Sequence, residues 1–271
     1  PDAVKTLVRI GAAVNDTDSD GMSALAWSAI KGHVDAMQCL LDAKADLHAR
    51  DKKDMTALAW ATHNAQVGSI KALIEGKATV DDKVKKGMTC LVIAAQNNSV
   101  DAVKALLELN ADVNGTDTYG KSALSWACQN MRTDNVKELI QARANVNTVD
   151  KTGSRALSWA AQYGHTEAVK ALLAASAVID DRNYRGMTAL YLAAQNGHAD
   201  AVKVLLEKKA DMHATDTSEA GLTPLMVTAT RGHAAVVRAL LDPLLADITA
   251  KKESLSVFMG AASNFQLVVP L

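Results

Sequence analysis

Residues 186–211, GMTALYLAAQNGHADAVKVLLEKKAD, contain the pattern that decides the fold of this 271-residue chain. Thr188 is a residue type that caps a helix, and the apolar segment after it ends at Gly197-His198. Glycine tolerates the positive φ of a tight turn, so the chain can reverse there. Residues 201–206 then have apolar side chains at helical spacing. The stretch therefore predicts two short helices joined by a tight turn.

The same pattern returns along the chain with a fixed period. The leucine of the first helix is Leu190 in this stretch. Its equivalents are Leu25, Leu58, Leu91, Leu124, Leu157 and Leu225, and Phe258 takes the place in the last copy. Successive copies are 33 residues apart, except for one step of 35 residues. Such a period is typical of a solenoid, in which each unit buries its apolar face against its neighbours.

The units resemble ankyrin repeats, whose pattern runs from G-x-T-x-L through A-A-x-x-G-H and L-L to A-D-V-N. One copy matches at Gly186 to Asn196, Gly197-His198, Leu205-Leu206 and Ala210-Asp211. The resemblance extends over essentially the whole chain. It implies an all-α solenoid of stacked helix-turn-helix units with β-hairpin finger loops along one edge. It also implies that partners bind the concave face formed by the finger tips and the first helices.

A single array is expected over residues 1–271. One partial repeat covers residues 1–17, and another starts at about residue 251. The full repeats are expected to begin near residues 18, 51, 84, 117, 150, 183 and 216. Because both ends stop within a repeat, we expect that further chain or neighbouring subunits cover them.

Several copies depart from the pattern at positions where the backbone needs a left-handed residue. The glycine–histidine pair is replaced by Ala65-Gln66, Asn98-Ser99 and Met131-Arg132. The glycine after the second helix is replaced by Lys44, Lys77, Arg143 and Lys209. A left-handed non-glycine residue costs up to ~1 kcal/mol, so the middle of the array is expected to be less stable than an ideal one.

Composition argues against several functional classes. The 29 basic and 30 acidic residues give a net charge of −1, without the basic excess that nucleic-acid binding requires. No apolar run approaches the ~20 residues of a membrane-spanning helix. The three cysteines are scattered, as in a protein of a reducing intracellular compartment, with cytoplasm or nucleus favoured.

No residue pattern indicates catalysis, and neither a cofactor nor a metal site is expected. Four histidines, His33, His165, His198 and His233, belong to the turn between the helices, where the family uses this residue structurally. Cys39, Cys90 and Cys128 fall in different repeats at helix positions, where they are interpreted as small buried residues. Phosphate-binding loops and nucleophile elbows are absent from the sequence.

Aromatic residues separate into two groups by repeat register. Every tryptophan (Trp27, Trp60, Trp126 and Trp159) lies two residues after the repeated leucine and is predicted to pack in the core against the neighbouring helix. The tyrosines Tyr119, Tyr163, Tyr184 and Tyr191 are instead predicted to lie on the concave face of the fourth to sixth repeats. Tyrosine offers area and a hydrogen bond at low entropic cost, so these positions are candidate partner contacts.

Basic residues collect on the finger loops. Lys52, Lys53, Lys85, Lys86 and Arg185 are candidate contacts to an acidic segment of a protein partner, and a solvated polar rim is the alternative interpretation. Lys83, Lys151 and Arg182 belong to the same set. Met22, Met55, Met88 and Met187 follow the finger turn and either contact a partner or pack finger against finger.

The leading hypothesis is therefore a non-catalytic protein–protein interaction scaffold, either free or as a structural subunit of a large assembly. The alternative is the ankyrin portion of a larger enzyme or channel whose active domain lies outside these residues. Full-length sequence separates the two hypotheses. Nucleic-acid binding is a third hypothesis, and the charge balance argues against it.

Overall fold

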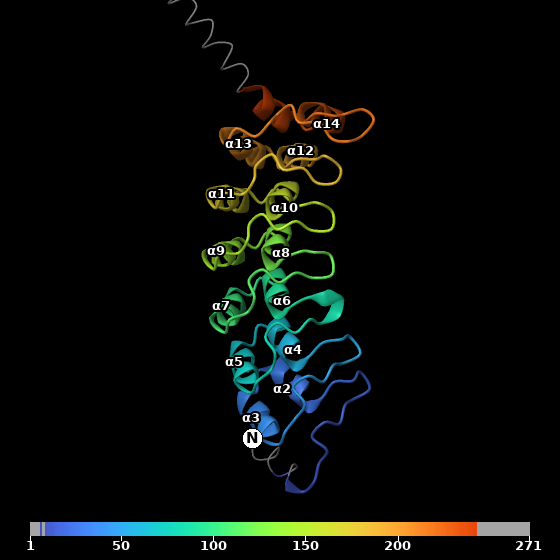
Figure 1. Ribbon diagram of the computed structural model, residues 1–271, viewed down its shortest axis with the longest axis vertical. Coiled ribbons are helices and arrows are strands. Elements are labelled where there is room, and N and C mark those ends of the chain that lie inside the picture. Colours follow the sequence, from blue (N-terminus) through green and yellow to red (C-terminus); the bar gives the residue numbers. More distant parts are fainter. Residues whose placement is uncertain (1–5, 7–8, 243–271) are drawn as a thin grey trace, which may run out of the picture.

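The computed structural model describes residue 6 and residues 9–242, which form one stack of helix pairs (Figure 1). The first helices are α2 (Ala24–Lys31), α4 (Ala57–His63), α6 (Cys90–Gln96), α8 (Ala123–Gln129), α10 (Ala156–Gln162), α12 (Ala189–Gln195) and α14 (Pro224–Arg231). The second helices are α3 (Val34–Asp42), α5 (Val67–Glu75), α7 (Val100–Glu108), α9 (Thr133–Gln141), α11 (Thr166–Ala174) and α13 (Ala199–Glu207), and residues 234–242 are helical after α14. The fold is the expected all-α helix-turn-helix solenoid.

Figure 1 shows the first helices in one column and the second helices in a parallel column. The loops between pairs extend on the side opposite to the second helices. The partial repeat expected from about residue 251 lies outside the described residues, as do residues 1–5 and 7–8 of the partial repeat expected at residues 1–17.

Most first helices begin at a side-chain cap. The Thr56 hydroxyl, for example, accepts a hydrogen bond from the backbone N–H of Ala59 at 3.2 Å. Equivalent bonds begin α2, α6, α8, α12 and α14, where the caps are Ser23, Thr89, Ser122, Thr188 and Thr223. Arg155 takes this place before α10 and makes no side-chain cap. The Ser/Thr pattern read from the sequence thus marks helix starts correctly.

The core lies between the helices of adjacent repeats. The repeated leucine is buried in α2 to α12, and alanines such as Ala94 and Ala160 are completely buried beside it. Small side chains let the helices approach closely, and first helices of neighbouring repeats are in contact along the whole described stack. Each repeat therefore covers the apolar face of the next, as a solenoid requires.

The loops at residues 18–22, 51–55, 84–88, 117–121, 150–154, 183–187 and 216–222, here called the fingers, differ from the expected β-hairpins. Within residues 9–242, their strand pairing is limited to isolated bridges, such as Thr116 with Ser122. The third finger includes a short 3₁₀ turn, Lys85–Gly87. Single backbone hydrogen bonds connect successive fingers, for example from Lys151 N–H to Tyr119 O at 2.9 Å. The fingers are therefore compact turns joined tip to tip.

The left-handed positions predicted from the sequence are confirmed. Lys44, Lys77, Arg143 and Lys209 have φ of 65°, 80°, 62° and 64°. Ala65, Asn98 and Met131, which replace the turn glycine, have φ of 56°, 62° and 57°. Gly164 shows why glycine is kept elsewhere: a Cβ there would lie 2.4 Å from Nδ1 of His198 in the next repeat.

Candidate functional site

The tryptophans connect the first helices to the fingers. Trp60, Trp126 and Trp159 pack against the core as predicted, but only with part of their surface, and the prediction was wrong for Trp27. Trp27 is 46% exposed, and Trp60, Trp126 and Trp159 are half-buried. Each indole N–H donates to the Oδ2 of an aspartate nine residues earlier, at 2.8–2.9 Å; the acceptors are Asp18, Asp51, Asp117 and Asp150. The helix position two residues after the repeated leucine therefore faces the fingers.

Each aspartate also organises its own finger. Asp117 Oδ1 accepts hydrogen bonds from the backbone N–H groups of Tyr119 at 2.8 Å and Lys121 at 2.9 Å. In the other repeats that contain tryptophan, Oδ1 of the equivalent aspartate likewise accepts hydrogen bonds from the backbone N–H groups two and four residues later. Hydrogen bonds to the Asp18 carboxylate from the Met22 backbone N–H and the Trp27 indole N–H lower the pKa of Asp18. One carboxylate thus shapes the finger and ties it to the helix.

Tyr191 is a correction to the predicted site. It lies directly after the repeated leucine and is only 2% exposed. Its hydroxyl donates to Asp216 Oδ2 of the next repeat at 2.9 Å, and burial, helped by Asp216, raises the pKa of Tyr191 to about 12. At Tyr191, the position directly after the leucine therefore points between repeats and not towards the concave face.

The other three predicted tyrosines are accessible. Tyr119, Tyr163 and Tyr184 are 49%, 40% and 75% exposed. Tyr163 follows α10 and stacks on Trp159 with ring centroids 6.3 Å apart. Tyr184 lies against the preceding finger, where a Cβ on Gly153 would meet its ring at 2.7 Å. The ring contacts of the described residues do not join these three tyrosines to one another.

The basic finger residues have two roles. Lys83 Nζ donates to Thr116 O at 3.0 Å and Arg182 Nη1 to Thr215 O at 2.8 Å, so these two side chains connect one finger to the next. The five predicted contacts Lys52, Lys53, Lys85, Lys86 and Arg185 are exposed. In the described part of the chain, no carboxylate lies within 4.0 Å of their charged groups.

Lys121 is buried between two indoles, a contact that the sequence analysis missed. Its Nζ lies 4.7 Å from the ring centroid of Trp126 and 3.5 Å from that of Trp159. It also donates to Gln129 Oε1 at 2.5 Å. Burial lowers the pKa of Lys121, and the Asp150 and Asp117 carboxylates oppose that shift. The side chain fills the space between α8 and α10 on the finger side.

The finger methionines pack inward. Met22 and Met55 are buried, at 6% and 8% exposed, and Met88 and Met187 are half-buried. The burial of Met22 and Met55 favours finger packing, and the same side chains also line pockets between the fingers and the first helices.

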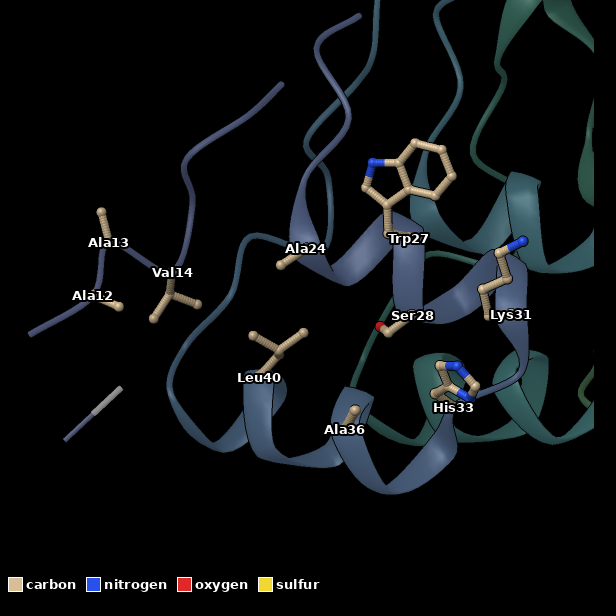
Figure 2. Close-up of a pocket in the computed structure, with 10 residues that line it drawn as sticks. All are labelled: Ala12, Ala13, Val14, Ala24, Trp27, Ser28, Lys31, His33, Ala36 and Leu40. Carbon is tan, nitrogen blue, oxygen red and sulfur yellow. The ribbon is translucent and has the colours of Figure 1, made fainter. Parts of the chain in front are cut away.

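A cavity of about 330 Å³ lies at the N-terminal end of the described stack (Figure 2). Figure 2 shows Val14, Ala24 and Leu40 around it, with Trp27 above. In the next repeat, α2 and α3 cover the corresponding surface of α4 and α5. The cavity is therefore a repeat-stacking surface, and its apolar lining has the same origin as the core.

Other chemical features of the described residues are few. Within residues 9–242, no cluster of histidine, cysteine and carboxylate side chains has the arrangement of a metal site. Burial raises the pKa of Cys90 to about 12 and raises that of Cys128 as well, so neither thiol is an activated nucleophile. The helices of this region also lack the combined length and apolar character needed to cross a bilayer.

Comparison with known families now identifies the repeats. The family model described as ankyrin repeats (3 copies) matches residues 1–83, 65–150, 134–216 and 157–252. The chain belongs to the ankyrin-repeat family. No curated protein matches it. Ankyrin-repeat domains generally mediate protein–protein interaction and are typically non-catalytic.

Histidines of the ankyrin turns join adjacent repeats. Nε2 of His198 donates to Gln162 O at 3.0 Å, and Nε2 of His233 donates to Gln195 O at 3.1 Å. Nε2 of His165, which lies one repeat after Met131, instead lies 2.8 Å from the Thr133 hydroxyl. These contacts support the structural role predicted for the turn histidines.

The aspartate–tryptophan pairs of this ankyrin array have a signal in the sequence. Tryptophan occurs in four repeats, and in each of them aspartate stands nine residues earlier. Where Ile93 or Leu192 takes the tryptophan position, the residue nine positions earlier is Val84 or Asn183. Aspartate and tryptophan thus occur together at a fixed spacing of nine residues, and this spacing indicates a hydrogen bond between their side chains.

Proposed function

We propose that this ankyrin-repeat array is a non-catalytic scaffold that holds a protein partner on the face formed by its fingers and first helices. The scaffold acts either alone or as a structural subunit of a larger assembly. Neither a cofactor nor a metal is part of the proposal. The free cysteines Cys39, Cys90 and Cys128 support a place in a reducing intracellular compartment.

One observation carries the proposal. The four aromatic side chains with large exposed fractions among the described residues all belong to this face: Trp27, Tyr119, Tyr163 and Tyr184. Exposed tyrosine and tryptophan are the residue types that most often dominate binding energy at protein interfaces. They stand beside basic groups without carboxylate partners, including Lys86 and Arg185. An aromatic surface with exposed basic groups at its edge suits a protein partner.

Nucleic acid is not part of the proposal. The net charge is −1, and the aspartates of the fingers lie on the same face as the lysines. A nucleic-acid surface would need a basic excess along the face.

Tyrosine replacement tests the proposal. Tyr119→Ala combined with Tyr163→Ala is expected to reduce partner retention by about tenfold or more, because two interface anchors are lost. The measurement is affinity capture from cell extract with the immobilised protein, read by quantitative mass spectrometry. Thermal unfolding should be nearly unchanged, since both side chains are accessible.

The matched control is Val34→Ala with Val178→Ala, which removes two exposed apolar side chains away from the fingers. It should retain the same proteins as the wild type. Equal retention by the tyrosine double variant and the wild type would contradict this surface as the binding site.

A further inference from the structure

Two pockets lie on either side of Trp60. They occupy equivalent positions in two successive repeats. The first, of about 160 Å³, is lined by Met22, Trp27, Ile30, Lys52 and Trp60, together with Lys53 and the carboxylates Asp20 and Asp51. The second, of about 290 Å³, has Met55, Trp60, His63, Lys85 and Ile93 at the corresponding positions, 33 residues later. Both open between a finger and two consecutive first helices. They belong to the face of the proposed function and define it more narrowly.

The Trp60 side chain forms the wall between the two pockets, and its position is fixed by contacts on both sides. The Trp60 indole N–H donates to Asp51 Oδ2 at 2.8 Å, and the His63 ring packs edge-on at a centroid distance of 5.7 Å. Asp51 is in turn bound to the backbone of its own finger through Lys53 and Met55. Because the wall is fixed before a ligand arrives, little entropy is lost when an apolar side chain enters either pocket.

The charge around the second pocket is positive and unneutralised. Lys53 and Lys85 line it, and no carboxylate does. The nearby acidic groups are already engaged: Arg50 pairs with Asp54 at 2.9 Å and with Asp82 at 3.0 Å. The ammonium groups of these two lysines are therefore available to carboxylates of a ligand.

A cation is the other ligand class that indoles attract. Farther along the array, a lysine of the chain itself supplies this cation, since Lys121 occupies the space between Trp126 and Trp159. Around Trp60 the corresponding finger residue is Met55, and the Lys53 Nζ already lies 5.4 Å from the indole centroid. A second cation would be repelled there. The observations favour an acidic ligand with apolar side chains.

We propose that the two pockets bind an extended acidic segment of a protein partner, with one apolar side chain in each pocket. Adjacent helices pack about 8–10 Å apart, which sets the distance between equivalent sites in neighbouring repeats. Three residues of a polyproline II segment span about 9 Å and return to the same face. The segment therefore has apolar residues three positions apart, with Asp or Glu near the one that enters the second pocket. This inference rests on the proposed protein-binding function.

Selection of a random dodecapeptide library on the immobilised protein tests the inference without choosing the sequence beforehand. Enriched peptides are expected to contain two apolar residues three apart with acidic neighbours. Fluorescence polarisation then measures their affinity for variants. Lys53→Glu with Lys85→Glu should weaken binding by about tenfold or more through lost charge pairing. Gln96→Trp, which fills the second pocket from the end of α6, should weaken it similarly.

The matched control reverses two exposed lysines on the second-helix side, Lys137→Glu with Lys208→Glu, and should change affinity less than twofold at moderate ionic strength. Circular dichroism and thermal unfolding verify that each variant is folded. Enrichment of basic peptides, failure to enrich any peptide, or binding that neither pocket variant reduces would overturn the inference. The lysate capture lost in Tyr119→Ala/Tyr163→Ala would still support the scaffold in those cases, so the two failures are distinguishable.

Discussion

At the residue scale, the hydrogen bond between aspartate and tryptophan holds the finger against the first helix in the four repeats that contain the pair. Asp117 is 5% exposed and accepts three hydrogen bonds, two from the backbone of its finger and one from the Trp126 indole. Because the acceptor is charged, such bonds are stronger than neutral ones. A turn that would otherwise be loosely attached is therefore held at two points, by its own backbone and by the helix.

A double-mutant cycle measures this coupling. Asp117→Ala and Trp126→Phe are each expected to destabilise the protein, and the double variant should lose less than the sum of the two. The expected coupling is about 1 kcal/mol, the order found for hydrogen bonds to charged groups in contact pairs. Urea unfolding provides the free energies. Strict additivity would contradict an energetic role for the indole–carboxylate bond.

At the level of elements, the turn between two helices of a repeat decides how strongly neighbouring repeats are connected. Gly164 and Gly197 leave room for the histidines of the next repeat, His198 and His233. Where Met131 replaces the glycine, the backbone still has φ of 57°, so the turn keeps its shape at the expense of strain.

Met131→Gly is expected to stabilise the fourth repeat. Left-handed geometry costs a non-glycine residue up to ~1 kcal/mol, and the added freedom of glycine in the unfolded chain offsets part of it, leaving about 0.5 kcal/mol. Met131 is 55% exposed, so little packing is lost. Denaturant unfolding checks the sign. Met131→Ala is the control, because it shortens the side chain and keeps the strain.

The sequence predicted the helix positions, the caps and the left-handed turns, because each depends on residues close together in the chain. The orientation of Tyr191 was predicted wrongly, since adjacent helix positions lie about 100° apart and the repeat pattern alone does not decide which of them faces the next repeat. Tyr119, Tyr163 and Tyr184 were correctly placed at accessible positions, and their role in binding stays a prediction. The pockets beside Trp60 depend on side chains of consecutive repeats meeting in space, which a single repeat pattern does not describe.

At the scale of the whole stack, the main contacts between the described helices join the same or adjacent repeats (Figure 1). Stability is then close to a sum of repeat energies and nearest-neighbour interface energies, and unfolding need not be all-or-none. A destabilising substitution in one repeat is therefore expected to destabilise the adjacent repeats more than distant ones.

Leu124→Ala tests this locality. Leu124 is completely buried in α8, and its truncation should cost about 2–5 kcal/mol. Hydrogen exchange measured by mass spectrometry should show the largest loss of protection in α8 and α9, less in α6 and α10, and little in α2 and α3. A uniform loss across all helices would show global cooperativity instead.

The arrangement of the four tryptophans also has an optical consequence. Because every indole in the chain lies at the base of a finger, all of the tryptophan emission originates from a single side of the solenoid. Quenching by a dissolved ion or a change in emission wavelength therefore reports the solvent access of that side alone, without any attached label.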